Sequence, residues 1–164
     1  MRSHHSVRAE GLYGVARLER EGMVRPMPPF DQPGAPWEPK RIVVIDDNVD
    51  GAESLKDVLE AGGHDVRVAF DGPEGLAALR SFVPDVVLCD IGLPGMDGYD
   101  VARAVRADPT LASAFLVALS GYAAAEDIER AKRAGFDRHM AKPPDLSALD
   151  RLLATVPSAR STRP

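Results

Sequence analysis

The sequence predicts an α/β fold in which a parallel five-stranded sheet is flanked by five helices. Short apolar runs alternate along the 164 residues with longer segments whose apolar residues recur at helical spacing. Several of the short runs are apolar at every position, as is typical of strands that are covered on both faces. Parallel strands need a crossover connection, and each intervening helix can provide one, so the sheet should be doubly wound.

The predicted strands are the five short apolar runs, of which the last is the weakest. They occupy residues 41–45, 66–70, 85–89, 115–119 and 138–141. Cys89, the only cysteine, lies inside the third run, where a small side chain is expected to be buried. An intramolecular disulfide is therefore excluded, and a reducing compartment is the simplest setting.

The predicted helices follow the strands, and their apolar residues recur every three or four positions. These residues are Leu55, Val58 and Leu59; Leu76, Leu79 and Phe82; Val101 and Val105; Ile128, Ala131 and Ala134; and Leu146, Leu149, Leu152, Leu153 and Val156. Gly62 and Gly63 should end the first helix, and Gly135 the fourth. The fourth helix is rich in alanine and charge, so Ile128 is expected to be its one large apolar anchor. A helix anchored so weakly is a candidate for conformational change.

One globular domain is expected between two irregular ends. Residues 26–39 contain six of the fourteen prolines, which disfavour a helix and favour an extended segment. We therefore predict a flexible proline-rich extension or linker over residues 1–39 and a domain over residues 40–156. Residues 157–164 are polar and bounded by prolines, and we expect them to form a disordered tail.

Charge and composition argue against several function classes. The formal net charge is −5, which disfavours binding of nucleic acid through a basic face. No stretch approaches the roughly 18 uninterrupted apolar residues that a membrane span requires, and the N-terminus lacks the layout of a secretion signal. We therefore expect a soluble, cytoplasmic protein that binds neither nucleic acid nor membranes.

Polar residues follow four of the predicted strands at their carboxyl ends, where doubly wound sheets place their functional groups. Asp46 and Asp47 follow the first strand, Asp90 the third, Ser120 the fourth and Lys142 the fifth. Converging carboxylates repel one another unless a cation lies between them. Oxygen-only ligands favour a hard cation, so these acids predict a Mg2+ site.

The lysine and the hydroxyl on the same edge are suited to a phosphoryl group, because one supplies charge and the other donates a hydrogen bond. A carboxylate can also act as a nucleophile and form an acyl phosphate. Asp90 lies at the centre of the set and is best placed for this role. For Asp46 and Asp47 alone, capping of the next helix is an equally good explanation, and Asn48 or Asp50 is expected to do only that.

The ordered set of motifs resembles the receiver domain of bacterial two-component response regulators. Its parts are Asp46-Asp47, Asp90 followed by IGLPGMDG, Ser120-Gly121 and Lys142-Pro143. The similarity covers about residues 40–156 and extends to the receivers of hybrid histidine kinases. It implies a flavodoxin-like receiver fold with the strand order 2-1-3-4-5.

The resemblance implies that Asp90 accepts a phosphoryl group from a phosphohistidine on a histidine kinase or a histidine phosphotransfer protein. Asp47, Asp90 and the backbone carbonyl of Gly92 would bind Mg2+ directly, and Asp46 would act mainly through water. Phosphorylation would then signal by conformational change. The chain would be a signalling phosphoacceptor rather than an enzyme, with at most self-phosphorylation and autodephosphorylation.

The resemblance also assigns roles to the lysine, the serine and a histidine. Lys142 would pair with Asp90 before transfer and with the phosphoryl oxygens afterwards, and its bond to Pro143 would be cis. Ser120 would donate to the phosphoryl group and move toward it. Many receivers have an aromatic residue three positions before the lysine that turns inward on activation, and here it is His139. His139 is either a switch of this kind or a half-exposed strand residue without a switching role.

Output would run through partners, through a phosphorelay, or through a second copy bound by the face of the fourth helix, fifth strand and fifth helix. The chain is either a stand-alone regulator or the receiver of a hybrid kinase. The alternative function is a Mg2+-dependent phosphohydrolase with an aspartyl nucleophile. Such enzymes typically carry a second acid two residues after the nucleophile, where this chain has Gly92. A receiver-like domain that acts without phosphorylation would lack some of the acids or the lysine, and all are present.

Overall fold

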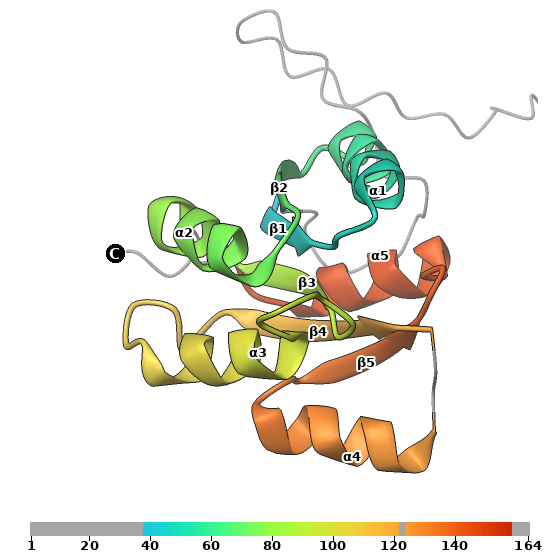
Figure 1. Ribbon diagram of the computed structural model, residues 1–164. Helices are drawn as coiled ribbons and strands as arrows, with labels where there is room; N and C mark the ends of the chain where they lie inside the picture. Colours follow the sequence, from blue (N-terminus) through green and yellow to red (C-terminus); the bar gives the residue numbers. More distant parts are fainter. Residues whose placement is uncertain (1–37, 122–123, 159–164) are drawn as a thin grey trace, which may run out of the picture.

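The computed structural model describes residues 38–121 and 124–158, so most of the predicted linker and tail lies outside the described residues. In this part of the chain, five strands and five helices alternate, as predicted (Figure 1). No helix within these two ranges has both the length and the apolar character needed to span a bilayer. The elements are β1 Arg41–Ile45, α1 Val49–Ala61, β2 Asp65–Ala69, α2 Gly72–Phe82, β3 Val86–Asp90, α3 Gly98–Ala107, β4 Phe115–Ser120, α4 Ala125–Ala134, β5 Arg138–Ala141 and α5 Leu146–Thr155.

The five strands form one parallel sheet in the order β2-β1-β3-β4-β5, which confirms the expected topology. β3 and β4 run one residue beyond their predicted ends, to Asp90 and Ser120. Asp90 pairs with Leu119 and Ser120 with Ala141, because the backbone ladder does not depend on the polarity of the side chain. Two of the predicted site residues therefore belong to the strands themselves.

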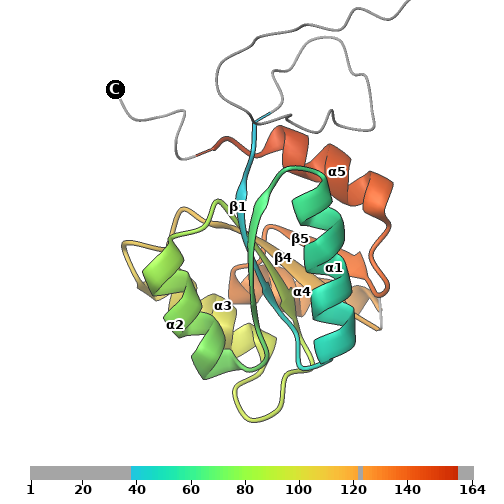
Figure 2. The ribbon, with the colours of Figure 1, turned by 90° about the horizontal axis from the view of Figure 1, so that it is seen from above.

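Helices cover both faces of the sheet, with α1 and α5 on one face and α2, α3 and α4 on the other (Figures 1 and 2). Successive side chains of each central strand point to opposite faces of the sheet. In β1, Ile42 and Val44 belong to the core under α1 and α5, whereas Val43 and Ile45 belong to the core under α2, α3 and α4. All four are fully buried, and Cys89 is buried as predicted.

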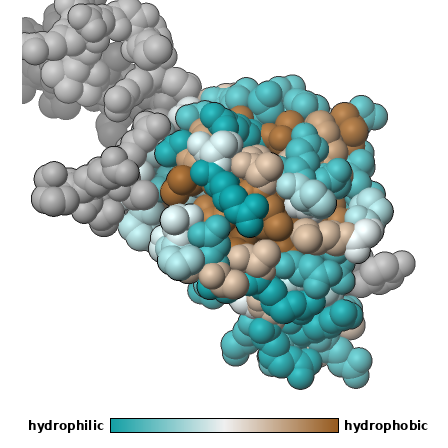
Figure 3. Space-filling model, turned by 60° about the vertical axis from the view of Figure 1, so that its left-hand side comes forward, coloured by the Kyte–Doolittle hydropathy of each residue, from teal (hydrophilic) through white to brown (hydrophobic). Residues whose placement is uncertain are grey.

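Three apolar helical residues that the sequence pattern placed in the core are exposed instead: Val58 by 45%, Ile128 by 40% and Leu146 by 44%. The prediction that Ile128 anchors α4 is wrong, because α4 packs through Ala131 and Ala134. Ile128 lies one turn nearer the N-terminus and about 60° round the helix from Ala131, at the edge of that contact. The lower part of the surface in Figure 3, where α4 lies, is almost entirely hydrophilic.

Side-chain caps begin four of the five helices. Asn48, Asp71, Asp97 and Asp145 each accept a hydrogen bond from a backbone N–H in the first turn, which confirms the predicted capping role of Asn48. α4 follows Ala124, which offers no side-chain hydrogen bond. A missing cap typically costs about 1 kcal/mol, so the start of α4 is the least restrained of the five.

Candidate functional site

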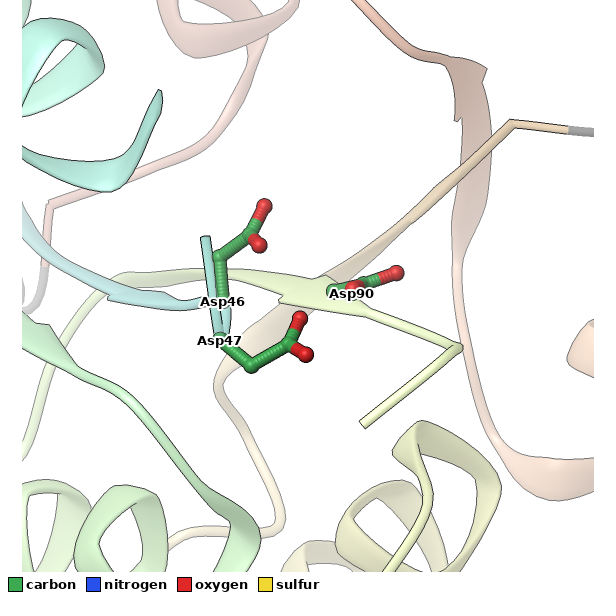
Figure 4. Close-up of side chains that lie close together, drawn as sticks. All are labelled: Asp46, Asp47 and Asp90. Carbon is green, nitrogen blue, oxygen red and sulfur yellow. The ribbon is translucent and has the colours of Figure 1, made fainter. Parts of the chain in front are cut away.

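Asp46, Asp47 and Asp90 lie together at the carboxyl edge of the sheet. β1 and β3 are neighbouring strands, so the residues at their ends meet there (Figure 4). One carboxylate oxygen of each residue lies within 4.8 Å of the other two. Asp46 and Asp90 are buried, whereas Asp47 is exposed. Three carboxylates at this separation form an oxygen-only group that could hold a hard metal ion.

Lys142 supplies the opposing charge from the end of β5. Its Nζ lies 2.6 Å from Asp46 Oδ2 and 3.2 Å from Asp90 Oδ2. Burial alone would lower the pKa of Lys142, but the hydrogen bond to Asp46 and the charges of Asp90 and Asp46 raise the pKa overall. The ammonium group is therefore strongly held in its charged form. The bond between Lys142 and Pro143 is cis, as expected.

Backbone amides hold the other oxygens of the two buried carboxylates. The N–H of Asn48 donates to Asp46 Oδ1 and the N–H of Gly92 donates to Asp90 Oδ1, both at 2.9 Å. Each carboxylate is thus fixed by an amide on one oxygen and by Lys142 on the other. The contact seen for Gly92 involves its amide, and metal binding through its carbonyl stays a prediction.

A cavity of about 240 Å³ opens beside the carboxylate of Asp90. It is lined by Asp90, Ile91, Gly92, Tyr99, Ser120, Gly121 and Asp127. Gly92 and Gly121 carry no side chains, and a Cβ at position 92 would lie 3.6 Å from Asp90 Oδ1. The sequence did not indicate Tyr99 or Asp127, because their spacing within α3 and α4 gives no sign that they face a strand end. The cavity leaves room for a reacting group next to Asp90.

Ser120 lines this cavity from the end of β4 and contacts His139 of β5. Its Oγ lies 2.7 Å from His139 Nε2, within hydrogen-bond distance. Ser120 is buried and His139 is half-buried. The two residues proposed from the sequence as switch candidates therefore contact each other directly, whereas Asp46, Asp47, Asp90 and Lys142 form the charged cluster.

The order of the strands and the chemistry at their carboxyl ends define the class of protein as a receiver domain with a flavodoxin-like fold. Comparison with known families agrees. Residues 42–154 match the response regulator receiver domain, and the chain belongs to this family. It is therefore a receiver domain of the two-component regulatory systems.

Two curated relatives show the range of proteins that contain a similar segment. The DNA-binding response regulator MtrA of Mycolicibacterium paratuberculosis is 39% identical over 104 residues, which cover 63% of this chain and 45% of MtrA. The sensor histidine kinase RcsC of Salmonella typhi is 31% identical over 154 residues, which cover 93% of this chain and 16% of RcsC. The chain thus spans less than half the length of either relative.

Solved structures support the same fold. A CheY-like response regulator receiver domain protein from Methanospirillum hungatei superposes with a TM-score of 0.63 at 28% identity, over 71% of this chain and 94% of that one. The chemotaxis protein CheY4 of Vibrio cholerae superposes with a TM-score of 0.69 at 24% identity, over 73% of this chain and 100% of that one. The second likeness concerns the fold alone.

Proposed function

We propose that this chain is the phosphoacceptor of a two-component phosphorelay and that Asp90 takes the phosphoryl group from a phosphohistidine. The observation that carries the proposal is the position of the Asp90 carboxylate. Of the three clustered acids in the described part of the chain, Asp90 alone lines the cavity. It also lies 3.2 Å from the ammonium group of Lys142. A nucleophile, a compensating charge and space for the donor thus occur together.

The transfer requires one oxygen of Asp90 to attack the phosphorus of the donor's N–P bond. A P–O bond forms as the N–P bond breaks, and the departing imidazole keeps the electron pair and takes up a proton from solvent. Lys142 opposes the charge of the phosphoryl oxygens, and Ser120 donates a hydrogen bond to one of them. The product is an acyl phosphate on Asp90, and the accompanying change of shape carries the signal.

The acids of the site fit Mg2+, because their donor atoms are all oxygens and lie close together. Asp47, Asp90 and the backbone carbonyl of Gly92 would hold the ion directly, and Asp46 would hold it through water. When bound, Mg2+ offsets the charge that the phosphoryl oxygens add to three clustered carboxylates. Lys142 carries one positive charge and contacts two of the three carboxylates, so it cannot balance the negative charge of the whole site.

The domain would act in the cytoplasm with a histidine kinase or a histidine phosphotransfer protein as its donor. Residues 40–156 would form the signalling unit, with residues 1–39 as a linker and residues 157–164 as a tail. The face made by α4, β5 and α5 would bind the output partner or a second copy. The hydrophilic surface of α4 suits an interface that forms and dissociates reversibly (Figure 3).

The proposal is tested by incubating the full chain with acetyl phosphate and Mg2+ and measuring the intact mass. We expect one phosphoryl adduct on the wild type and none on Asp90→Asn. Asp50→Asn, which changes an exposed acid in the first turn of α1, should keep the adduct. An adduct that survives in Asp90→Asn, or continuous hydrolysis of a phosphate monoester by the wild type, would reject the proposal.

A further inference from the structure

An acid occupies the core-facing side of α4 in its first turn. α4 packs through Ala131 and Ala134, and Asp127 lies one turn before Ala131 on the same side of the helix. Asp127 is half-buried, whereas its neighbour Glu126 is exposed. Asp127 also lines the cavity beside Asp90. A helix normally places an apolar residue at such a position, so the acid points to a role in the cavity.

The carboxylate of Asp127 has no hydrogen-bond or ion-pair partner among the residues that the structure describes. Arg130 is three positions further along α4, a spacing at which an acid and a base often pair. Its guanidinium group lies instead over the ring of Tyr99, 4.2 Å from the ring centroid. Lys142 contacts other acids of the site. A half-buried carboxylate without a donor is unfavourable, so it suits a reactant that brings one.

Phosphoryl donors differ in the group that leaves. A phosphohistidine or phosphoramidate breaks an N–P bond, and its departing group can present an N–H. An acyl phosphate such as acetyl phosphate breaks an O–P bond, and its departing carboxylate is an anion. A carboxylate on the wall of the cavity accepts a hydrogen bond from the first kind of leaving group and repels the second.

We propose that Asp127 selects donors with a nitrogen leaving group by accepting a hydrogen bond from the N–H of that group. This inference rests on the proposed function of Asp90. The P–O bond to Asp90 forms as the N–P bond breaks, and the nitrogen keeps the electron pair. Phosphoramidate in its zwitterionic form is already protonated on nitrogen and releases ammonia, whereas imidazole takes its proton from solvent. Asp127 therefore stays ionised, and it lies outside the group of three acids that could hold a metal ion.

An acid in the first turn of a helix also interacts favourably with the helix dipole. Glu126 occupies the same turn as Asp127, but it is exposed and does not line the cavity. The two acids thus share the effect on the helix and differ in their access to the reacting groups. Glu126→Gln is therefore the matched control for Asp127→Asn, because each change replaces a carboxylate by an amide of the same size.

The test compares phosphoramidate with acetyl phosphate as donors to the full chain in the presence of Mg2+. Intact mass gives the initial rates, and the ratio of the phosphoramidate rate to the acetyl phosphate rate is compared between variants. Asp127→Asn should lower this ratio roughly three- to tenfold, because the negative charge in the cavity is lost. Glu126→Gln should leave the ratio near that of the wild type, as should Asp127→Glu, which keeps the charge.

The outcomes separate the two proposals. No adduct from either donor on the wild type rejects the proposed function of Asp90. An adduct on the wild type with an equal or higher ratio in Asp127→Asn rejects the selection by Asp127 and leaves the function intact. A loss of rate that is equal for both donors, or the same change of ratio in Glu126→Gln, also rejects the selection, because the effect would then come from the helix. Asp127→Ala replaces Asp127→Asn if thermal unfolding shows that the latter is not folded.

Discussion

The ammonium group of Lys142 lies closer to Asp46 than to Asp90, at 2.6 Å against 3.2 Å. One cation is therefore shared by two buried acids, and Asp47 is the exposed member of the cluster. Repulsion among three carboxylates is only partly relieved by one lysine, so the cluster should bind a second cation readily. We therefore expect Asp47 to make the main contribution to metal binding.

Asp47→Ala should abolish the stabilisation that Mg2+ gives the folded domain, because it removes the exposed carboxylate of the cluster. A ligand that binds only the folded state raises the melting temperature. Thermal unfolding with Mg2+ and with a chelator should show this rise in the wild type and in Asp50→Ala, but not in Asp47→Ala. A normal response to Mg2+ in Asp47→Ala would contradict the assignment.

His64 should make the domain less stable in mild acid. Its Nδ1 accepts a hydrogen bond of 3.1 Å from the N–H of Lys40, and burial lowers the pKa of His64 below its ordinary value of 6.5 despite the charge of Asp150. The unfolded chain therefore binds more protons than the folded chain below about pH 6.5, and stability is lost as the pH falls through this region.

Urea denaturation of the wild type and of His64→Asn checks this expectation, since asparagine keeps an acceptor but does not titrate. The free energy of unfolding should fall more steeply in the wild type between about pH 7 and pH 5. Equal slopes for the two proteins would show that His64 does not contribute.

At the level of elements, the two ends of α4 are held differently. The guanidinium group of Arg106 in α3 donates to the carbonyls of Gly135, Ala112 and Ala114 and to the carboxylate of Asp137. These bonds tie the C-terminal end of α4 to the loop before β4. The N-terminal end of α4 has no side-chain cap, so its two ends differ in restraint.

Arg106→Met should lower the free energy of unfolding by about 2–3 kcal/mol, because three carbonyls and a carboxylate lose a charged donor. Arg103→Met is a matched control on the same helix, where the arginine forms an exposed ion pair with Asp100 and its loss should change stability little. Urea denaturation measures both values. An equally small effect for the two variants would contradict the role given to Arg106.

The start of α4 should open more often than the start of α3. Ile128 and Val101 occupy equivalent positions, since each donates its N–H to the residue that precedes the helix, at 3.2 Å and 3.1 Å. Asp97 caps α3 with its side chain, whereas Ala124 cannot cap α4. Hydrogen exchange should therefore be faster at the amide of Ile128 than at that of Val101. Equal protection would contradict the difference in restraint.

At the level of the whole molecule, the sheet could be predicted because its central strands are apolar at every position, and helices separate them. The five site residues at four strand ends, Asp46, Asp47, Asp90, Ser120 and Lys142, followed from the same reasoning. Which side of each helix faces the sheet was harder to predict from the sequence. Val58, Ile128 and Leu146 are exposed, because small residues such as Ala131 can pack against the core instead. The ends of β3 and β4 lie one residue beyond their predicted positions, because backbone pairing continues through residues with polar side chains.

The pairing of Lys142 with Asp90 was expected, but the contacts that the helices make and the contact between Ser120 and His139 were beyond sequence reasoning. The cavity beside Asp90 includes Tyr99 and Asp127, which depend on how α3 and α4 pack. The bond between Ser120 and His139 depends on the register of β4 and β5, which no local pattern encodes. The sequence therefore identified the chemical groups, and the structure showed which of them share a hydroxyl, a lysine or a cavity.

The most direct test of the central claim is to locate the phosphoryl group on the chain. After treatment with acetyl phosphate and Mg2+, borohydride reduces an aspartyl phosphate to homoserine, and peptide mass spectrometry finds the altered position. We expect homoserine at position 90 alone. Homoserine at position 46 or 47, or an unmodified Asp90 in a chain that carries the adduct, would contradict it.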